Sequence, residues 1–127
     1  MREIIFRGKR KDDGEWEFGN LIISPYLKNC VMIERLQTKN GYHATLIVKP
    51  ESVGQYTGVK DKNRKKIFEG DIVAFDGGHF VVEYIDCRMG FAFSGLRGRG
   101  IVIGFSMSDW EHIEIIGNIH DNPELLG

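Results

Sequence analysis

The stretch from Lys60 to Lys66 crowds cationic side chains between two apolar segments, with Asp61 as its only acid. Such a cluster can bind nucleic-acid phosphates or an acidic protein surface by charge alone. Exposed hairpin turns also carry charge simply to stay soluble, and the sequence leaves both interpretations open. The cations are Lys60, Lys62, Arg64, Lys65 and Lys66.

The glycine-rich segment "GLRGRG" forms a second basic stretch, which carries Arg97 and Arg99. These two arginines could join the first cluster if folding brings the loops together. The whole chain has 17 cations and 18 carboxylates, for a net charge of −1. Long-range attraction to a polyanion is therefore not expected, and any such binding must come from a local patch.

The other reactive side chains do not form a recognised catalytic arrangement. Glu69 and Asp71 are too isolated to suggest the opposed carboxylates of a glycosidase, and Asp71 is expected to accept hydrogen bonds from nearby backbone amides. No glycine-rich phosphate loop or zinc-type Cys/His spacing is present. We expect no cofactor, no metal and no enzymatic activity, with a small enzyme of unrecognised type as the remaining alternative. The histidines are His43, His79, His112 and His120.

The segment "GFAF" matches the centre of an RNA-recognition strand, in which aromatic rings stack on bases. Met89 stands where that motif requires a cation, and the chain lacks the two helices that the RNA-recognition fold packs behind its sheet. We therefore expect Phe91 and Phe93 to be core residues on one face of a strand. A base-stacking aromatic face stays the alternative.

Apolar residues mostly alternate with polar ones or form short runs between turns, which predicts about ten β-strands and an antiparallel all-β fold. One predicted hairpin joins "VMIERL" to "YHATLIVK" through the turn dipeptide Asn40-Gly41. Only short helical turns are expected, one of them starting at Pro123. Cys30 and Cys87 are predicted to be unpaired thiols, Trp16 and Trp110 to be core or interface aromatics, and no segment is long and apolar enough for a membrane span.

The 127 residues suffice for a single β domain, residues 1–127. Two segments, "FRGKRKDDGEWEFGNLI" and "YTGVKDKNRKKIFEGDIV", share an aromatic-x-Gly opening, a charged turn and a Gly-(Asn/Asp)-aliphatic-aliphatic ending. Either hairpins of similar build arose by coincidence, or the domain contains two related barrel-like halves, at about residues 1–50 and 51–127.

Five segments together resemble the YopX family of small bacteriophage and prophage proteins: "MREIIFRG", "GNLI", "VGQYTGVKDKN", "IFEGDIV" and "IGNIHDNPELL". The resemblance implies an SH3-like barrel, a phage or prophage origin and a place in the cytoplasm of the bacterial host, but no biochemical activity. The family's usual turn reads Lys-Asn-Gly, whereas here Arg64 follows Asn63. Because arginine is poor at positive φ, we expect Asn63 alone to take the left-handed conformation, in a longer loop.

The leading functional hypothesis is a non-enzymatic accessory protein that binds another macromolecule, either a protein or a nucleic acid of the host bacterium. The nucleic-acid alternative would use the Lys60 to Lys66 turn. Self-association into a homo-oligomer is compatible with both.

Overall fold

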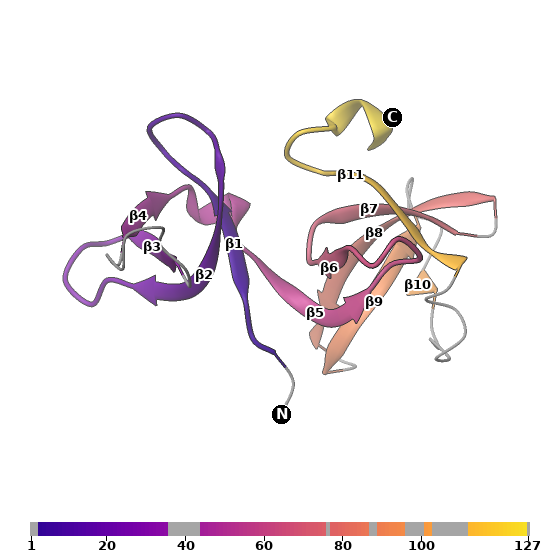
Figure 1. The fold of residues 1–127 in the computed structure, drawn as a ribbon, viewed down its shortest axis with the longest axis horizontal. Coiled ribbons are helices and arrows are strands. Elements are labelled where there is room, and N and C mark those ends of the chain that lie inside the picture. Colours follow the sequence, from indigo (N-terminus) through magenta and orange to yellow (C-terminus); the bar gives the residue numbers. More distant parts are fainter. Residues whose placement is uncertain are drawn as a thin grey trace. The chain divides into compact units, whose positions relative to one another are not determined.

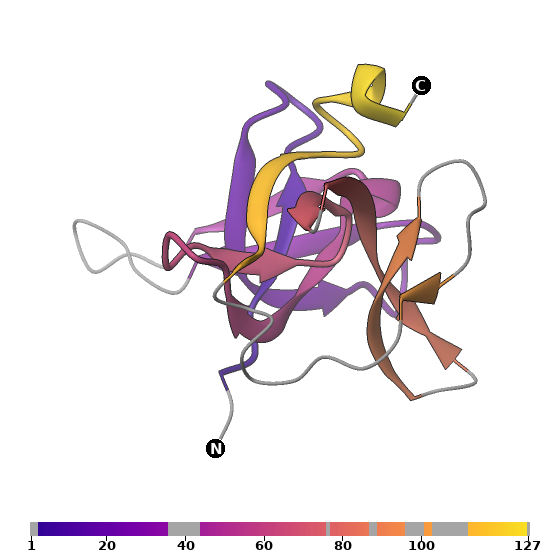
Figure 2. The same ribbon diagram turned by 90° about the vertical axis from the view of Figure 1, so that its right-hand side faces the viewer.

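The computed structural model describes residues 3–35, 44–75, 77–86, 89–95, 101–102 and 112–126. Within these residues the chain forms eleven β-strands and short 3-10 turns, with no α-helix. Antiparallel pairing joins β1 to β2 and β5, β3 to β2 and β4, β7 to β8 and β11, and β9 to β8 and β10 (Figures 1 and 2). These findings confirm the predicted fold class and the predicted helical turn at Pro123, which is η4 (Pro123–Leu126).

The chain divides into two compact units, Met1–Tyr56 and Thr57–Gly127. The first contains β1 (Phe6–Lys9), β2 (Trp16–Ile23), β3 (Val31–Arg35), β4 (Thr45–Val48), η1 (Pro50–Ser52) and the start of β5 (Gly54–Lys60). Their hydrogen-bonded order is β4-β3-β2-β1-β5. The pairing of β3 with β4 confirms the predicted hairpin, although Asn40 and Gly41 lie outside the described residues.

The edge of β4 that does not pair with β3 forms backbone hydrogen bonds with the end of β1 and the residues that follow it. Arg10 and Val48 form an antiparallel bridge. The Lys11 N–H donates to the Ile47 carbonyl at 3.1 Å, and the Lys49 N–H donates to the Lys9 carbonyl at 2.8 Å. These bonds satisfy backbone groups that an open sheet edge would leave to solvent or to another chain.

The second unit contains the end of β5, β6 (Lys66–Phe68), β7 (Asp71–Phe75), β8 (Gly78–Ile85), β9 (Gly90–Gly95), β10 (Ile101–Val102), β11 (Glu114–Asn118) and η4. β6 lies beside β5, and the other strands form a sheet of order β10-β9-β8-β7-β11. A register shift interrupts β11 between Ile115 and Gly117. No closed barrel is present among the strand pairings of the described residues.

The two units share one strand order, in which four strands follow each other as a meander and a fifth returns to pair with the first. The repeated sequence pattern does not follow this correspondence. It matches the β1–β2 hairpin to the β5–β6 hairpin, whereas the shared order matches β1 to β7. The resemblance between the two hairpins is therefore local and concerns their turns.

Each unit has its own apolar centre. Ile33 and Val48 are fully buried in the first unit, where Gly8 lies so close that an added Cβ would be 2.8 Å from Val48 Cγ2. In the second unit the fully or almost fully buried cluster is Ile67, Val73, Val82 and Ile113, against which Phe75, Phe80 and Ile115 pack. The alternation on β2, with Glu17 and Gly19 buried and Phe18 and Asn20 exposed, is the period-two pattern of a sheet with two different faces.

Gly19→Ala tests this packing. A Cβ at Gly19 would lie 1.8 Å from the Glu34 carbonyl oxygen, and a backbone atom cannot move aside without breaking the β2–β3 pairing. We expect the free energy of unfolding to fall by about 2 kcal/mol or more, in the range of overpacked cores. Urea unfolding measures it, with Asn20→Ala at the exposed neighbouring position as the control. Equal unfolding midpoints for the two variants would contradict the packing described.

Candidate functional site

The predicted basic turn joins β5 to β6 and is organised by the carboxylate of Asp61. Asp61 is only 5% exposed. Its Oδ1 accepts hydrogen bonds from the N–H groups of Asn63 at 2.8 Å and Lys65 at 2.9 Å. Its Oδ2 accepts a hydrogen bond from the N–H of Ile115 in β11, at 3.1 Å. One side chain thus fixes the turn internally and ties it to a strand that follows 54 residues later.

A second set of contacts holds the turn against the same segment. The Lys62 N–H donates to the Ile113 carbonyl at 2.9 Å. Lys62 Nζ lies 3.2 Å from Glu114 Oε2, and both side chains are more than 40% exposed, so this ion pair contributes little stability. The expectation that Asp61 is the acid opposing the cations needs correction. Its carboxylate is engaged by backbone N–H groups, and Glu114 from β11 is the acid that pairs with Lys62.

The expected conformation of the turn was also wrong. Arg64, not Asn63, takes the left-handed conformation, with φ of 65°. The physical reason is the hydrogen-bond pattern, because the Asn63 N–H is held by Asp61 Oδ1 and the Arg64 N–H donates to the Asp61 carbonyl at 3.0 Å. The chain then reverses at Arg64 so that the Asp61 N–H reaches the Lys65 carbonyl at 2.8 Å.

The β1–β2 hairpin offers an internal comparison for this position. Gly14 follows Gly8 by six residues, as Arg64 follows Gly58, and Gly14 has φ of 76°. The side chain of Asp13 accepts the Glu15 N–H at 2.9 Å, much as Asp61 accepts that of Lys65. The first hairpin thus places glycine where the second places arginine. The conformation at Arg64 belongs to the turn, and the arginine is strained by it.

The structure leaves most of the predicted cations at the surface. Lys60, Lys62, Arg64 and Lys65 are exposed and Lys66 is half-buried. Arg97 and Arg99 lie outside the described residues, so their expected contribution to the same patch stays a prediction. The sequence did contain a feature that pointed to the role of Asp61, since an aspartate in a turn typically accepts a hydrogen bond from the backbone N–H two residues later.

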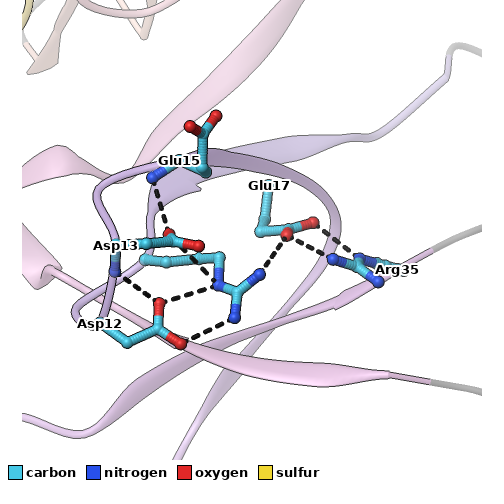
Figure 3. A network of polar contacts seen from close by, with 6 residues as sticks. Asp12, Asp13, Glu15, Glu17 and Arg35 are labelled. Carbon is cyan, nitrogen blue, oxygen red and sulfur yellow. Dashed lines mark hydrogen bonds and ion pairs between the residues drawn. The ribbon is translucent and has the colours of Figure 1, made fainter.

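A charged network in the first unit was not predicted. Glu17 on β2 is buried, and its carboxylate faces the guanidinium of Arg35 on β3 (Figure 3). The two hydrogen bonds, from Arg35 Nε and Nη2, measure 2.8 and 2.6 Å. Arg10 Nη1 lies 3.6 Å from the same carboxylate, and Arg10 also binds both carboxylate oxygens of Asp12. The β1–β2 turn and the strands β2 and β3 meet here, and no spacing in the sequence predicts which of their side chains pair.

This network sets the ionisation of Glu17. The hydrogen bond from Arg35 lowers the pKa of the Glu17 carboxyl below its ordinary value, against burial, which acts in the opposite direction. A side chain held in this way serves structure, because its carboxylate is already occupied by cations of the same chain.

Trp16 on β2 makes cation–π contacts within the same sheet. The Arg7 guanidinium lies 4.7 Å and Lys9 Nζ 5.6 Å from the Trp16 ring centroid, and Trp16 is half-buried.

The remaining sequence predictions have mixed outcomes. The prediction for Asp71 is confirmed, since its buried Oδ2 accepts the Phe68 N–H at 2.7 Å. The core prediction is wrong for Phe91, which is half-buried and packs edge-on against the exposed Tyr84 at 5.4 Å. The buried residue of this segment is its neighbour Ala92, because side chains alternate across the strand. The side chain of Phe93 lies outside the described part of the chain.

Other candidate residues remain scattered. His79 and His112 are exposed, and His120 is half-buried. Across the described ranges, no group of three His, Cys, Asp or Glu side chains could hold a metal ion. Cys30 is a free, half-buried thiol, whereas Cys87, His43 and Trp110 fall in ranges that are not described. Within the described residues, no helix has the length and apolar character that crossing a membrane requires.

Comparisons with known proteins point to one family. The model of the YopX protein family matches residues 5–127. Among three matching chains of solved structures is protein EF1440 from Enterococcus faecalis, which is 23% identical with a TM-score of 0.66 and full coverage of both chains. At that identity the likeness concerns the fold alone. No curated protein matches the chain.

The strain at Arg64 predicts a stabilising substitution. Arg64→Gly should raise the free energy of unfolding by about 0.5–1 kcal/mol, because a left-handed non-glycine residue costs about 1–2 kcal/mol and glycine loses part of that gain through chain entropy. Arg64→Ala is the matched control, since it removes the same charge but keeps a Cβ at positive φ. Urea unfolding at low and high salt compares the variants. An equal gain for both would assign the effect to charge and contradict the strain.

The lowered pKa of Glu17 predicts a pH dependence of stability. The unfolded carboxyl, with a pKa of about 4.3, binds a proton more readily than the folded one, so stability rises with pH through this range. The contribution is fully present above the unfolded pKa and is lost as pH falls through the folded pKa. Glu17→Gln should cost about 1.5–3 kcal/mol at pH 7, as for a hydrogen bond to a charged group, and progressively less below about pH 4.

Glu15→Gln is the control for this measurement. It removes the same charge two residues away, at an exposed side chain. Urea unfolding between about pH 3 and pH 7 should then show a pH-dependent difference from wild type for Glu17→Gln only. A constant difference across that range would rule out the ion pair as its cause.

Proposed function

The chain belongs to the YopX family, and from that premise we propose that it is a non-catalytic binding protein that attaches to another macromolecule through the basic turn, residues Lys60 to Lys66. Family membership does not indicate a biochemical activity, so the proposal depends on the structure of the turn itself. The carrying observation is that Asp61 and the segment 113–115 bind the backbone of the turn, while Lys60, Arg64 and Lys65 extend into solvent.

This arrangement suits electrostatic recognition. The backbone of the turn is fixed before binding, so a partner need not order the loop, and only side-chain freedom is lost. Glu114 already pairs with Lys62 at 3.2 Å, and an anionic partner would compete with it for this lysine. A carboxylate or phosphate surface of opposite charge is the complement that the exposed cations fit.

An acidic protein surface is the favoured partner. The net charge of −1 gives the whole molecule no long-range attraction to a nucleic acid, whereas a short-range protein contact needs only the local patch. Nucleic-acid binding is the second candidate because the turn concentrates exposed cations. It would be insensitive to base sequence, since a short lysine-rich loop presents charge without a fixed geometry for reading bases.

We infer that the first unit is an SH3-like barrel and that the second is built on the same plan. Support comes from the five-strand order, from the Arg10–Val48 bridge that joins β4 to the chain after β1, and from the 3-10 turn η1 directly before β5. The family resemblance supports a phage or prophage origin and action in the cytoplasm of a bacterial host. A base-stacking platform at Tyr84 and Phe91 gains less support, because the exposed Asp86 at the end of β8 would repel phosphates.

The nucleic-acid candidate is tested by fluorescence anisotropy with labelled duplex DNA and single-stranded RNA at about 150 mM salt. We expect micromolar or weaker binding, little changed when Lys62, Arg64, Lys65 and Lys66 are replaced together by Gln. Submicromolar binding that disappears in this quadruple variant would establish nucleic acid as the partner. Neutralising about four phosphates would then give a salt slope near −3.6 on duplex DNA.

The favoured candidate is tested by affinity purification from a lysate of the organism that encodes the chain, with wild type and quadruple variant compared by quantitative mass spectrometry. We expect at least one acidic protein to be retained by wild type, lost in the variant and released by high salt. Each substitution at the exposed Lys62, Arg64 and Lys65 should change the free energy of unfolding by less than about 0.5 kcal/mol. Identical retained proteins for both chains would refute a role of the turn in binding.

A further inference from the structure

A loop between β2 and β3 presents large apolar side chains that the described part of the protein does not bury. This Tyr26 loop comprises residues Ser24 to Cys30. Tyr26 is 93% exposed and Leu27 is 64% exposed, and Ile23, the last residue of β2, is 69% exposed. Isolated exposed apolar residues are ordinary, but three at one end of a hairpin form a surface feature that calls for a partner.

The backbone of the Tyr26 loop is held by its own polar groups. Ser24 Oγ accepts the N–H groups of Tyr26 at 3.2 Å and Leu27 at 3.0 Å. The Ser24 N–H donates to the Cys30 carbonyl at 3.0 Å, which holds the two ends of the loop together. Asn29 takes the left-handed conformation that reverses the chain, with φ of 59°. The apolar side chains are therefore displayed by a formed loop, so little conformational entropy would be lost when a partner buries them.

The charge on the loop indicates the chemistry of its partner. Lys28, next to Leu27, is the only charged residue between Ser24 and Cys30, and it is exposed. Two exposed apolar side chains next to an exposed cation are complementary to an apolar pocket with carboxylates at its rim. Tyrosine is enriched among the residues that dominate binding energy at protein interfaces, because its ring is large and loses few rotamers.

We propose that the Tyr26 loop is a second docking surface, which inserts Tyr26 and Leu27 into an apolar pocket of a partner protein whose acidic rim pairs with Lys28. This surface belongs to the first unit, whereas the basic turn belongs to the second. The protein would accordingly contact macromolecules through two surfaces of different chemistry, one apolar and one cationic. The Tyr26 loop docks its partner whether or not the basic turn binds.

The occupant is found by photo-cross-linking. The purified chain carries benzoylphenylalanine in place of Tyr26, and a control chain carries it in place of Phe18, which is also exposed, at 47%, and lies on β2 of the same unit. Both are irradiated in a lysate of the organism that encodes the protein. We expect one protein cross-linked at position 26 and not at position 18. No cross-link above the control, a cross-link to a second copy of the chain, or a cross-link to lipid only would each overturn the proposal.

The captured protein is then purified and titrated against defined variants. Tyr26→Ser combined with Leu27→Ser should weaken binding at least about tenfold, as for the loss of an interface hot spot, and Lys28→Glu should weaken it as well. The quadruple variant of the basic turn should bind as wild type, which separates this proposal from the function proposed above. A smaller loss in the double variant, or unchanged binding with Lys28→Glu, would overturn the pocket or its acidic rim respectively.

Discussion

The buried carboxylate of Asp61 is the interaction on which the basic turn depends. A buried carboxylate is costly unless hydrogen bonds satisfy it, and here three backbone N–H groups do so, from Asn63, Lys65 and Ile115. Two of these bonds shape the turn and the third attaches it to β11. The same residue therefore determines the local conformation, the position of the turn in the second unit and the orientation of the cations that surround it.

This arrangement forces a compromise at Arg64. The bonds of Asp61 require a chain reversal between Asn63 and Lys65, and the residue at the reversal must take positive φ. The β1–β2 hairpin meets the same requirement with Gly14 and has no side chain to strain. An arginine in this position gives up stability but adds an exposed cation at the tip of the turn. The loss of stability at Arg64 has a physical reason if its charge is used in binding, because the strained arginine does not stabilise the fold.

Local features of the sequence predicted much of the fold. Period-two alternation predicted the all-β class, the Asn40-Gly41 dipeptide the β3–β4 hairpin, and Pro123 the short terminal turn, because these depend on neighbouring residues alone. The hydrogen-bonding role of Asp71 follows from the same kind of local chemistry. The Glu17–Arg35 pair, the hydrogen bond from Ile115 to Asp61 and the Lys62–Glu114 pair were not predicted, since each depends on how separate strands and turns lie beside each other and not on neighbouring residues. Phe91 was misjudged because a hydrophobic residue on a strand can belong to either face.

The backbones of the basic turn and of the Tyr26 loop are stabilised in the same way. In each, a small polar side chain accepts the N–H groups of the residues that follow it: Asp61 in the turn and Ser24 in the loop. In each, a non-glycine residue at positive φ completes the reversal: Arg64 in one and Asn29 in the other. Because local bonds already satisfy these backbones, the larger side chains are not needed to hold the chain in place. The cations of the basic turn and the apolar groups of the Tyr26 loop are therefore available for contacts with other molecules. This is the physical reason for interpreting both as binding surfaces and not as parts of the fold.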